Sequence, residues 1–149
     1  NLHEAELFDE IIKLVRNGMP ILGICVGFQS LFSDCNEFGS HKGFNFINGS
    51  VRKIVEKNIL KIPHIGWNNC EIKNFDNLFK NLSNEQDFYF CHSYEVLQVD
   101  KKLILSQTFY GHEIISSIKK DNIYGVQFHP EKSQQNGLTL LKNFGEYCG

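Results

Sequence analysis

The sequence lacks the features that mark several large classes of protein. Its formal net charge is only −2, so it has no basic surplus of the kind that binds nucleic acid. No apolar run approaches the roughly 20 residues that a helix needs to span a bilayer, and no signal peptide precedes the first helical pattern. Repeats, low-complexity tracts and an interdomain linker are missing as well. We expect one domain, residues 1–149, that binds neither nucleic acid nor membrane.

The number and spacing of the cysteines indicate which kinds of site and which redox compartment to expect. The five cysteines are widely spaced: Cys25, Cys35, Cys70, Cys91 and Cys148. Their odd number and the lack of any C-x-x-C pair argue against a disulfide framework and a zinc knuckle. Histidines at the close spacing that zinc requires, such as H-x-x-x-H, are missing too. These absences predict no metal, no cofactor and a reducing cytoplasm as the place of action.

The hydrophobic pattern alternates between helical and strand periods. An amphipathic helix is predicted over residues 2–18 with Gly18 as its cap, followed by a short buried strand over 20–25 and the start of a helix over 26–32. Further elements are a glycine-rich loop (37–50), strand candidates (50–56, 62–72 and 87–96), a turn or two of helix (78–82) and a closing helix (136–149). Residues 103–110 and 113–131 predict two or three more strands, with a hairpin turn at residues 119–122. We therefore expect an α/β fold, a mixed sheet flanked by helices and carrying additional antiparallel strands.

The segment PILGICVGFQSLF, residues 20–32, places Cys25 between two glycines where the strand gives way to the helix. A tight turn there exposes the side chain. Gly23 and Gly27 would allow close approach of neighbouring elements, or take backbone angles closed to other residues. The dipole of the following helix would favour the thiolate, which is the reactive form of cysteine. The alternative is a small buried hydrophobic side chain, and this motif alone leaves both open.

A base for such a nucleophile is available far downstream, in the order His129-Pro130-Glu131 at the end of a predicted strand. In extended chain, residues i and i+2 project to the same side, and Pro130 keeps the segment out of a helix. His129 and Glu131 can therefore project together as a base and its orienting carboxylate. Taken singly, His129 could be a surface or capping histidine and Glu131 a solvated charge.

Longer stretches resemble a known family. GICVGFQ together with GVQFHPEKS resembles the signature of class I, triad-type glutamine amidotransferases. The segments KGFNFINGSVRKI, KIPHIGWNNCEI, FYFCHSYEV and HPEKSQ resemble, in order, the glutaminase subunits of imidazole glycerol phosphate synthases from histidine biosynthesis. The similarity covers essentially the whole chain. It implies an enzyme that hydrolyses glutamine to glutamate and ammonia.

The resemblance assigns roles to residues of this chain. Cys25 would attack the glutamine carboxamide, His129 would be the base and later the acid, and Glu131 would orient His129. The remaining positions share a role in binding: Gln29, Glu37, His92, Ser93 and Tyr94 for glutamine, the N–H of Val26 and the elbow residue Gly27 for the oxyanion, and His64, Trp67 and Asn68 in a segment near the synthase partner. For Trp67, plain core packing is an alternative.

The resemblance also implies a partner. Ammonia released into water would mostly protonate, so the chemistry calls for a protected path to an acceptor. The family partner is a (β/α)₈ cyclase, which would form a heterodimer with this chain and make imidazole glycerol phosphate and an aminoimidazole carboxamide ribotide. Three alternatives stay open: a paralogue feeding another synthase, such as one that amidates a surface sugar, a non-catalytic regulatory module, and a γ-glutamyl peptidase.

The chain departs from the family pattern in two ways. Val26 and Phe28 stand where Leu and Met are more usual, and these apolar exchanges should matter little. Family members also begin with further β-α units, including a Pro-Gly-Val-Gly-type turn that completes the oxyanion hole, and the sequence shows no counterpart. We expect the 149 residues expressed alone to be poorly folded and inactive, and cooperative thermal unfolding would refute this.

Overall fold

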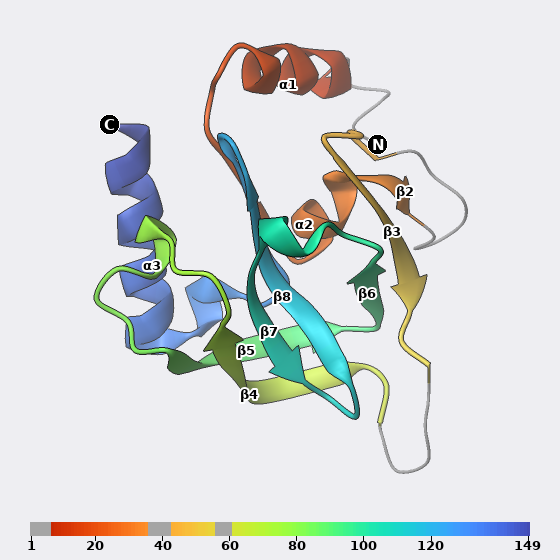
Figure 1. The fold of residues 1–149 in the computed structure, drawn as a ribbon, viewed down its shortest axis with the longest axis vertical. Coiled ribbons are helices and arrows are strands. Elements are labelled where there is room, and N and C mark those ends of the chain that lie inside the picture. The colour runs from red at the N-terminus through yellow and green to blue at the C-terminus, as the bar shows by residue number, and fades with distance from the viewer. Residues whose placement is uncertain (1–6, 36–42, 56–60) are drawn as a thin grey trace.

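The computed structural model describes residues 7–35, 43–55 and 61–149, which form a mixed α/β fold (Figure 1). The described helices are α1 (Leu7–Arg16), α2 (Val26–Ser30) and α3 (Gln134–Cys148), with 3₁₀ turns η1 (Asn77–Phe79), η2 (Lys101–Leu103) and η3 (Pro130–Lys132). The strands are β1 (Ile21–Ile24), β2 (Phe32–Cys35), β3 (Ile47–Lys53), β4 (His64–Ile72), β5 (Glu85–His92), β6 (Tyr94–Leu97), β7 (Ile104–Phe109), β8 (Glu113–Lys120) and β9 (Ile123–Val126).

The strands form two sheets. The larger sheet has the order β1-β9-β8-β7-β4-β5, and the smaller sheet has the order β2-β3-β6. In the larger sheet only β1 and β9 pair in parallel, with Ile21 opposite Ile123, and its other pairs are antiparallel. Because parallel strands end at the same edge of a sheet, the residues after β1 and after β9 come together.

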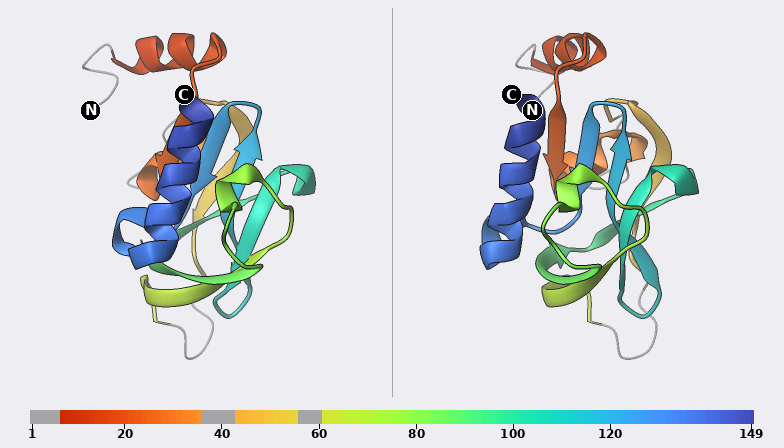
Figure 2. Two further views of the ribbon diagram at one scale, coloured as in Figure 1. Left: turned by 90° about the vertical axis from the view of Figure 1, so that its left-hand side faces the viewer. Right: turned by 60° about the vertical axis from the view of Figure 1, so that its left-hand side comes forward.

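Two apolar clusters hold these layers together. One lies between the sheets and α2, and includes Phe28, Val51 and Ile118. The other lies beneath α3, which packs along one face of the large sheet, and includes Phe128 and Leu140 (Figure 2). Burying each such side chain contributes about 1.5–3 kcal/mol relative to leaving it in water. Phe28 follows β1 and Phe128 follows β9, so packing in the two clusters fixes the positions of these segments.

The first predicted helix and its cap are confirmed among the described residues. After α1, Gly18 has φ +96°, its N–H donates to the carbonyl of Val15 at 3.0 Å, and the N–H of Met19 donates to that of Leu14 at 3.1 Å. This pair of hydrogen bonds is the Schellman pattern, in which glycine provides the left-handed residue. None of the described helices combines the length and the apolar character needed to cross a membrane.

Two boundaries differ from the prediction. The second helix ends at Ser30 and is followed by β2, and β3 begins at Ile47, inside the stretch expected to be loop. Phe32 and Ile47 are both buried and lie opposite each other in the β2–β3 pair, so tertiary packing overrides the local glycine signal. The first part of that predicted loop, residues 37–42, lies outside the described part of the chain.

The aromatic stretch over residues 87–96 forms two strands instead of one. It divides at Ser93, so that β5 belongs to the large sheet and β6 to the small one. The segment His92-Ser93-Tyr94 is thus the point where the chain passes from the large sheet to the small one.

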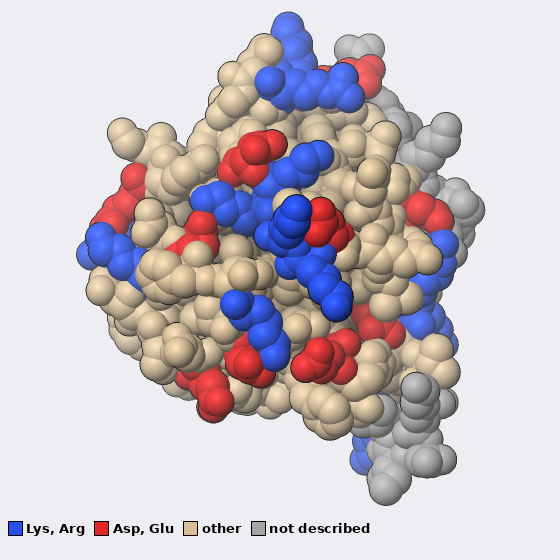
Figure 3. All heavy atoms as spheres, viewed as in Figure 1, with Lys and Arg blue, Asp and Glu red and all other residues tan. Residues whose placement is uncertain are grey.

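On the face drawn in Figure 3, basic and acidic side chains are interspersed, so this face carries no extended surface of one charge sign.

Candidate active site

Cys25 sits on a sharp turn at the end of β1. Its backbone N–H donates to the carbonyl of Val126 at 2.9 Å, and its φ of 53° with ψ of −107° is a conformation that L residues rarely adopt. Such strain in a non-glycine residue is typical of a nucleophile held on a strand-to-helix elbow. The side chain is half-buried, so the expectation of a fully buried hydrophobic cysteine does not hold.

The expected close approach of neighbouring elements is confirmed at Gly23 but not at Gly27. A Cβ on Gly23 would lie 2.6 Å from the backbone oxygen of Gly27, so Gly23 is required for the close packing of β1 against α2. A Cβ on Gly27 would meet nothing within 4 Å, and neither glycine has a positive φ. The unusual backbone angle belongs to Cys25 itself. The helix behind it, α2, has only five residues, so the dipole expected to favour the thiolate is that of a short helix.

His129 and Glu131 form the expected pair. The Nδ1 atom of His129 lies 2.7 Å from Oε1 of Glu131. Because a carboxylate only accepts, Nδ1 carries the proton, and in the neutral ring Nε2 then holds the lone pair of a base. The reason for the pairing was predicted wrongly: Glu131 lies in the 3₁₀ turn η3, with Pro130 at its start, and not in extended chain.

Strand β5 brings the cysteine and the histidine to one place. In the strand order β5 stands at the opposite end of the large sheet from β1, yet its backbone contacts the residues that follow β1 and β9. The thiol of Cys25 donates to the carbonyl of Cys91 at 3.7 Å, and the backbone N–H of His129 donates to the carbonyl of Tyr89 at 2.8 Å. Carbonyls two residues apart point the same way along a strand, so both groups meet one edge of β5.

Sequence reasoning missed Gln127. This residue is fully buried, its Nε2 lies 3.9 Å from Sγ of Cys25, and its Oε1 accepts a hydrogen bond from Nε2 of Gln29 at 3.2 Å. The signal available was a polar residue two positions before His129, directly after a fully buried strand. Its partners could not be read from the sequence because they come from the β1–α2 elbow.

Gln29 is aimed at the site by its neighbours. It is buried, and its Nε2 donates to Oε1 of Gln127 and, at 3.4 Å, to the carbonyl of Tyr94. Its Oε1 is buried and accepts no hydrogen bond among the described residues. A buried acceptor without a partner is costly, so this oxygen is available for a ligand that donates hydrogen bonds. Glu37, expected to bind glutamine as Gln29 does, lies outside the described residues.

The remaining predicted residues divide between the interior and the surface. His64 and His92 are buried against each other, so the side chain of His64 faces inward and not toward a partner. Trp67 is 49% exposed, which excludes plain core packing for its side chain. Asn68 is half-buried and reaches both His64 and the surface.

Burial sets the charge state of the two inner histidines. It lowers the pKa of His64 to about 4, with the neighbouring His92 adding to the effect. Burial likewise lowers the pKa of His92 to about 4, opposed by its hydrogen bond to the carbonyl of Tyr94 and assisted by the nearby His129. Both rings are therefore neutral near pH 7.

Comparison with known proteins places this arrangement in a family. Residues 3–147 match the family described as class I glutamine amidotransferase, and the chain belongs to that family. Among curated relatives, imidazole glycerol phosphate synthase subunit HisH of Geobacter sulfurreducens is 43% identical, over 98% of this chain and 72% of that protein. Subunit HisH 2 of Methanococcus maripaludis is 46% identical, over 97% of this chain and 71% of that protein.

Solved structures agree in fold. A putative GMP synthase component from Thermoplasma acidophilum matches with a TM-score of 0.67 at 25% identity, over 98% of this chain and 66% of that one. PurLQS from Thermotoga maritima matches with a TM-score of 0.69 at 18% identity, over 96% of this chain and 68% of that one. The chain thus spans about two thirds of the length of the proteins that it matches.

Proposed function

We propose that this chain carries the glutaminase site of an imidazole glycerol phosphate synthase and hydrolyses glutamine to glutamate and ammonia. The observation that carries the proposal is the strained Cys25 elbow after β1, held at one edge of β5 together with the His129–Glu131 pair that follows β9. The identity of more than 40% with HisH subunits supports the choice of this synthase within the family.

The proposed reaction has two steps. The thiolate of Cys25 attacks the carboxamide carbon of glutamine, the C–N bond breaks, and Nε2 of His129 delivers a proton to the departing ammonia. Water, deprotonated by the same nitrogen, then cleaves the glutamyl thioester and returns the thiolate. Glu131 holds the ring through Nδ1 and stabilises its protonated form in both steps.

Two sets of groups would assist these steps. The N–H groups of Val26 and Gly27 lie in the first turn of α2, where helix N–H groups have no partner within the helix, and would bind the developing oxyanion. Oε1 of Gln29, which has no partner among residues 7–35, 43–55 and 61–149, would accept from the α-ammonium of glutamine, while the backbone of Ser93 and Tyr94 would complete its site. Glu37 remains a proposed contact of the same ligand.

The proposed partner is a (β/α)₈ cyclase that takes up the ammonia and releases imidazole glycerol phosphate and an aminoimidazole carboxamide ribotide, a lyase-type reaction. Trp67 and Asn68 would belong to the interface between the two subunits of the heterodimer. This is supported by the exposure of Trp67 and of Ile65, two residues earlier on β4, which is 57% exposed. We also propose action in the reducing cytoplasm, supported by the free thiols of Cys70, Cys91 and Cys148.

The test is glutamate release from glutamine by the full-length parent protein, with and without its candidate cyclase, beside Cys25→Ala. We expect release that requires Cys25 and rises when the cyclase is added. Release that requires Cys25 but ignores the cyclase would contradict the assignment to this synthase. No Cys25-dependent release under either condition would contradict the glutaminase itself.

A further inference from the structure

Four groups form a continuous hydrogen-bonded row from the surface to the junction of the two sheets. The Nδ2 atom of Asn68 lies 3.2 Å from Nε2 of His64. Nδ1 of His64 lies 2.9 Å from Nε2 of His92, and Nδ1 of His92 lies 2.7 Å from the carbonyl oxygen of Tyr94. His64 and His92 face each other across the β4–β5 pair, so the register of these strands builds the row.

The direction of every hydrogen bond in the row follows from its inner end. A carbonyl oxygen can only accept, so Nδ1 of His92 must carry the proton. In a neutral ring the other nitrogen then accepts, and His64 must donate to it from its own Nδ1. This leaves Nε2 of His64 as an acceptor for the amide N–H of Asn68. Each imidazole is thereby held in the Nδ1–H form.

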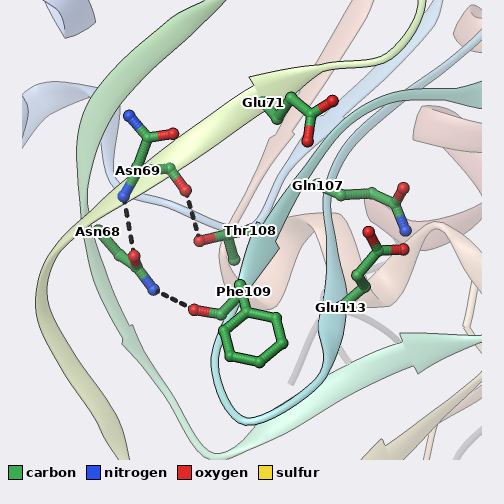
Figure 4. Close-up of a pocket in the computed structure, with 7 residues that line it drawn as sticks. All are labelled: Asn68, Asn69, Glu71, Gln107, Thr108, Phe109 and Glu113. Carbon is green, nitrogen blue, oxygen red and sulfur yellow. Dashed lines mark hydrogen bonds between the residues drawn. The ribbon is translucent and has the colours of Figure 1, made fainter.

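The outer end of the row is fixed independently. The second N–H of the Asn68 amide donates to the carbonyl of Phe109 at 3.0 Å, and its Oδ1 accepts from the backbone N–H of Asn69 at 2.8 Å (Figure 4). With the amide satisfied on both atoms, its orientation cannot be reversed without losing hydrogen bonds. The ring of His64 is also held from both sides, with ring centroids 4.6 Å from Phe90 and 4.0 Å from Tyr110.

The inner end of the row touches the residues that would bind glutamine. The carbonyl of Tyr94 accepts from His92 and also from Nε2 of Gln29. The same Nε2 donates to Gln127, and this orientation leaves Oε1 of Gln29 without a hydrogen-bond partner in the part of the chain that the structure describes. A displaced Tyr94 carbonyl would release the amide of Gln29 from the orientation that presents its oxygen.

We propose that Asn68, His64 and His92 form a directed hydrogen-bond row whose task is to position the Tyr94 carbonyl and, through it, the glutamine-binding amide of Gln29. This role rests on the proposed glutaminase function. The three side chains act as positioning residues, since the row ends on Tyr94 and Gln29 and not on the reacting sulfur. The row therefore governs the binding of glutamine more than the chemical step.

Asn68→Asp tests the row with little change of shape. A carboxylate can only accept, so it cannot donate to Nε2 of His64, and the row can persist only if the imidazole protons move. In the full-length protein with its cyclase at saturating concentration, so that a weakened heterodimer does not limit the rate, we expect KM for glutamine to rise about tenfold, as an unsatisfied buried acceptor implies, with kcat changed less than about twofold. Gln107→Glu is the matched control, because it adds the same charge in the same pocket outside the row (Figure 4).

Side-chain ¹⁵N NMR provides a readout that a merely structural role would not move. We expect His64 and His92 of the wild-type protein to be neutral and protonated on Nδ1, and His64 of Asn68→Asp to carry a proton on Nε2. Thermal unfolding of both variants checks that they are folded.

Three results would overturn the proposal. These are a wild-type His92 protonated on Nε2, a KM for Asn68→Asp equal to that of Gln107→Glu, and a loss confined to kcat. A wild-type protein without Cys25-dependent glutamate release would instead overturn the proposed function, and with it this role. The two failures are therefore distinguishable by the wild-type assay.

Discussion

The parallel pair β1–β9 and the antiparallel pair β4–β5 contribute to the site in different ways. The first delivers Cys25 and His129 from the ends of its strands, on short turns that follow directly in the chain. The second contributes from the middle and end of long strands, through the carbonyls of Tyr89 and Cys91 and the buried pair His64–His92. The reactive side chains thus follow the ends of parallel strands, whereas the carbonyls and histidines that hold the site in place are positioned by the pairing register of antiparallel strands.

The largest expected effect concerns the pair at the end of β9. Replacing Glu131 by Gln keeps the shape but removes the charge that stabilises the protonated ring of His129. We expect kcat for glutamine hydrolysis to fall about 100-fold, within the usual range for general acid–base catalysis, with KM little changed. Steady-state kinetics of the full-length complex measures this.

Glu146→Gln on α3 is the control for that substitution, since it removes an exposed carboxylate whose ion-pair partner is Lys142, at 3.8 Å. Equal kcat values for Glu131→Gln and the wild-type protein would show that the 2.7 Å contact between His129 and Glu131 has no part in catalysis.

The next effect concerns the antiparallel pair and its pH dependence. The pKa values of His64 and His92 are about 4 when folded, below the usual 6.5, so the unfolded chain binds more protons between these values. The free energy of unfolding should therefore fall as the pH decreases from about 6.5 to 4, by up to about 1.4 kcal/mol per pH unit for each histidine. Denaturant unfolding of the full-length protein at several pH values measures the slope.

His64→Phe separates the histidine contribution to this pH dependence from the contribution of Asp and Glu side chains, which also take up protons as the pH falls. The ring keeps the stacking on Phe90 and Tyr110 but cannot take up a proton. We expect a shallower dependence on pH between 6.5 and 5 than in the wild-type protein. Identical slopes would mean that His64 does not take up a proton on unfolding in this pH range.

The smallest effect compares the two glycines of the elbow. Gly23→Ala would place a Cβ 2.6 Å from the oxygen of Gly27, whereas Gly27→Ala meets nothing within 4 Å. We expect Gly23→Ala to lower the free energy of unfolding by about 1–3 kcal/mol through overpacking. Gly27→Ala, at an open helical position without a positive φ, should leave it unchanged or raise it by up to about 1 kcal/mol. If thermal unfolding shows equal losses, the close approach of β1 and α2 is not the constraint.

Features that depend on adjacent residues could be predicted from the sequence, whereas features that depend on the pairing of distant strands could not. The elbow at Cys25 and the partnership of His129 with Glu131 depend on a few adjacent residues, and short motifs predicted both. The local backbone was predicted less well, because Cys25 takes the positive φ expected of a glycine and Glu131 lies in a 3₁₀ turn. Motifs specify which residues meet more reliably than the angles that bring them together.

Features set by long-range packing were not predictable. Strand β2 follows α2 because Phe32 pairs with Ile47, and nothing near Phe32 in the chain announces this. The row through His64 and His92 requires the register that places these residues opposite each other, and the contact of Gln127 with Gln29 joins segments far apart in sequence. A single sequence carries no signal for such partners, since one polar residue in an apolar strand can face many others.

Labelling of Cys25 by a glutamine-mimicking electrophile tests the central claim most directly. The full-length protein would be treated in the presence of its cyclase, digested and analysed by mass spectrometry, with and without excess glutamine. The account predicts stoichiometric modification of Cys25, protection by glutamine, and no label on Cys91, whose side chain is exposed on the neighbouring strand. Labelling of Cys91 in preference to Cys25, or labelling of Cys25 that glutamine does not slow, would contradict it.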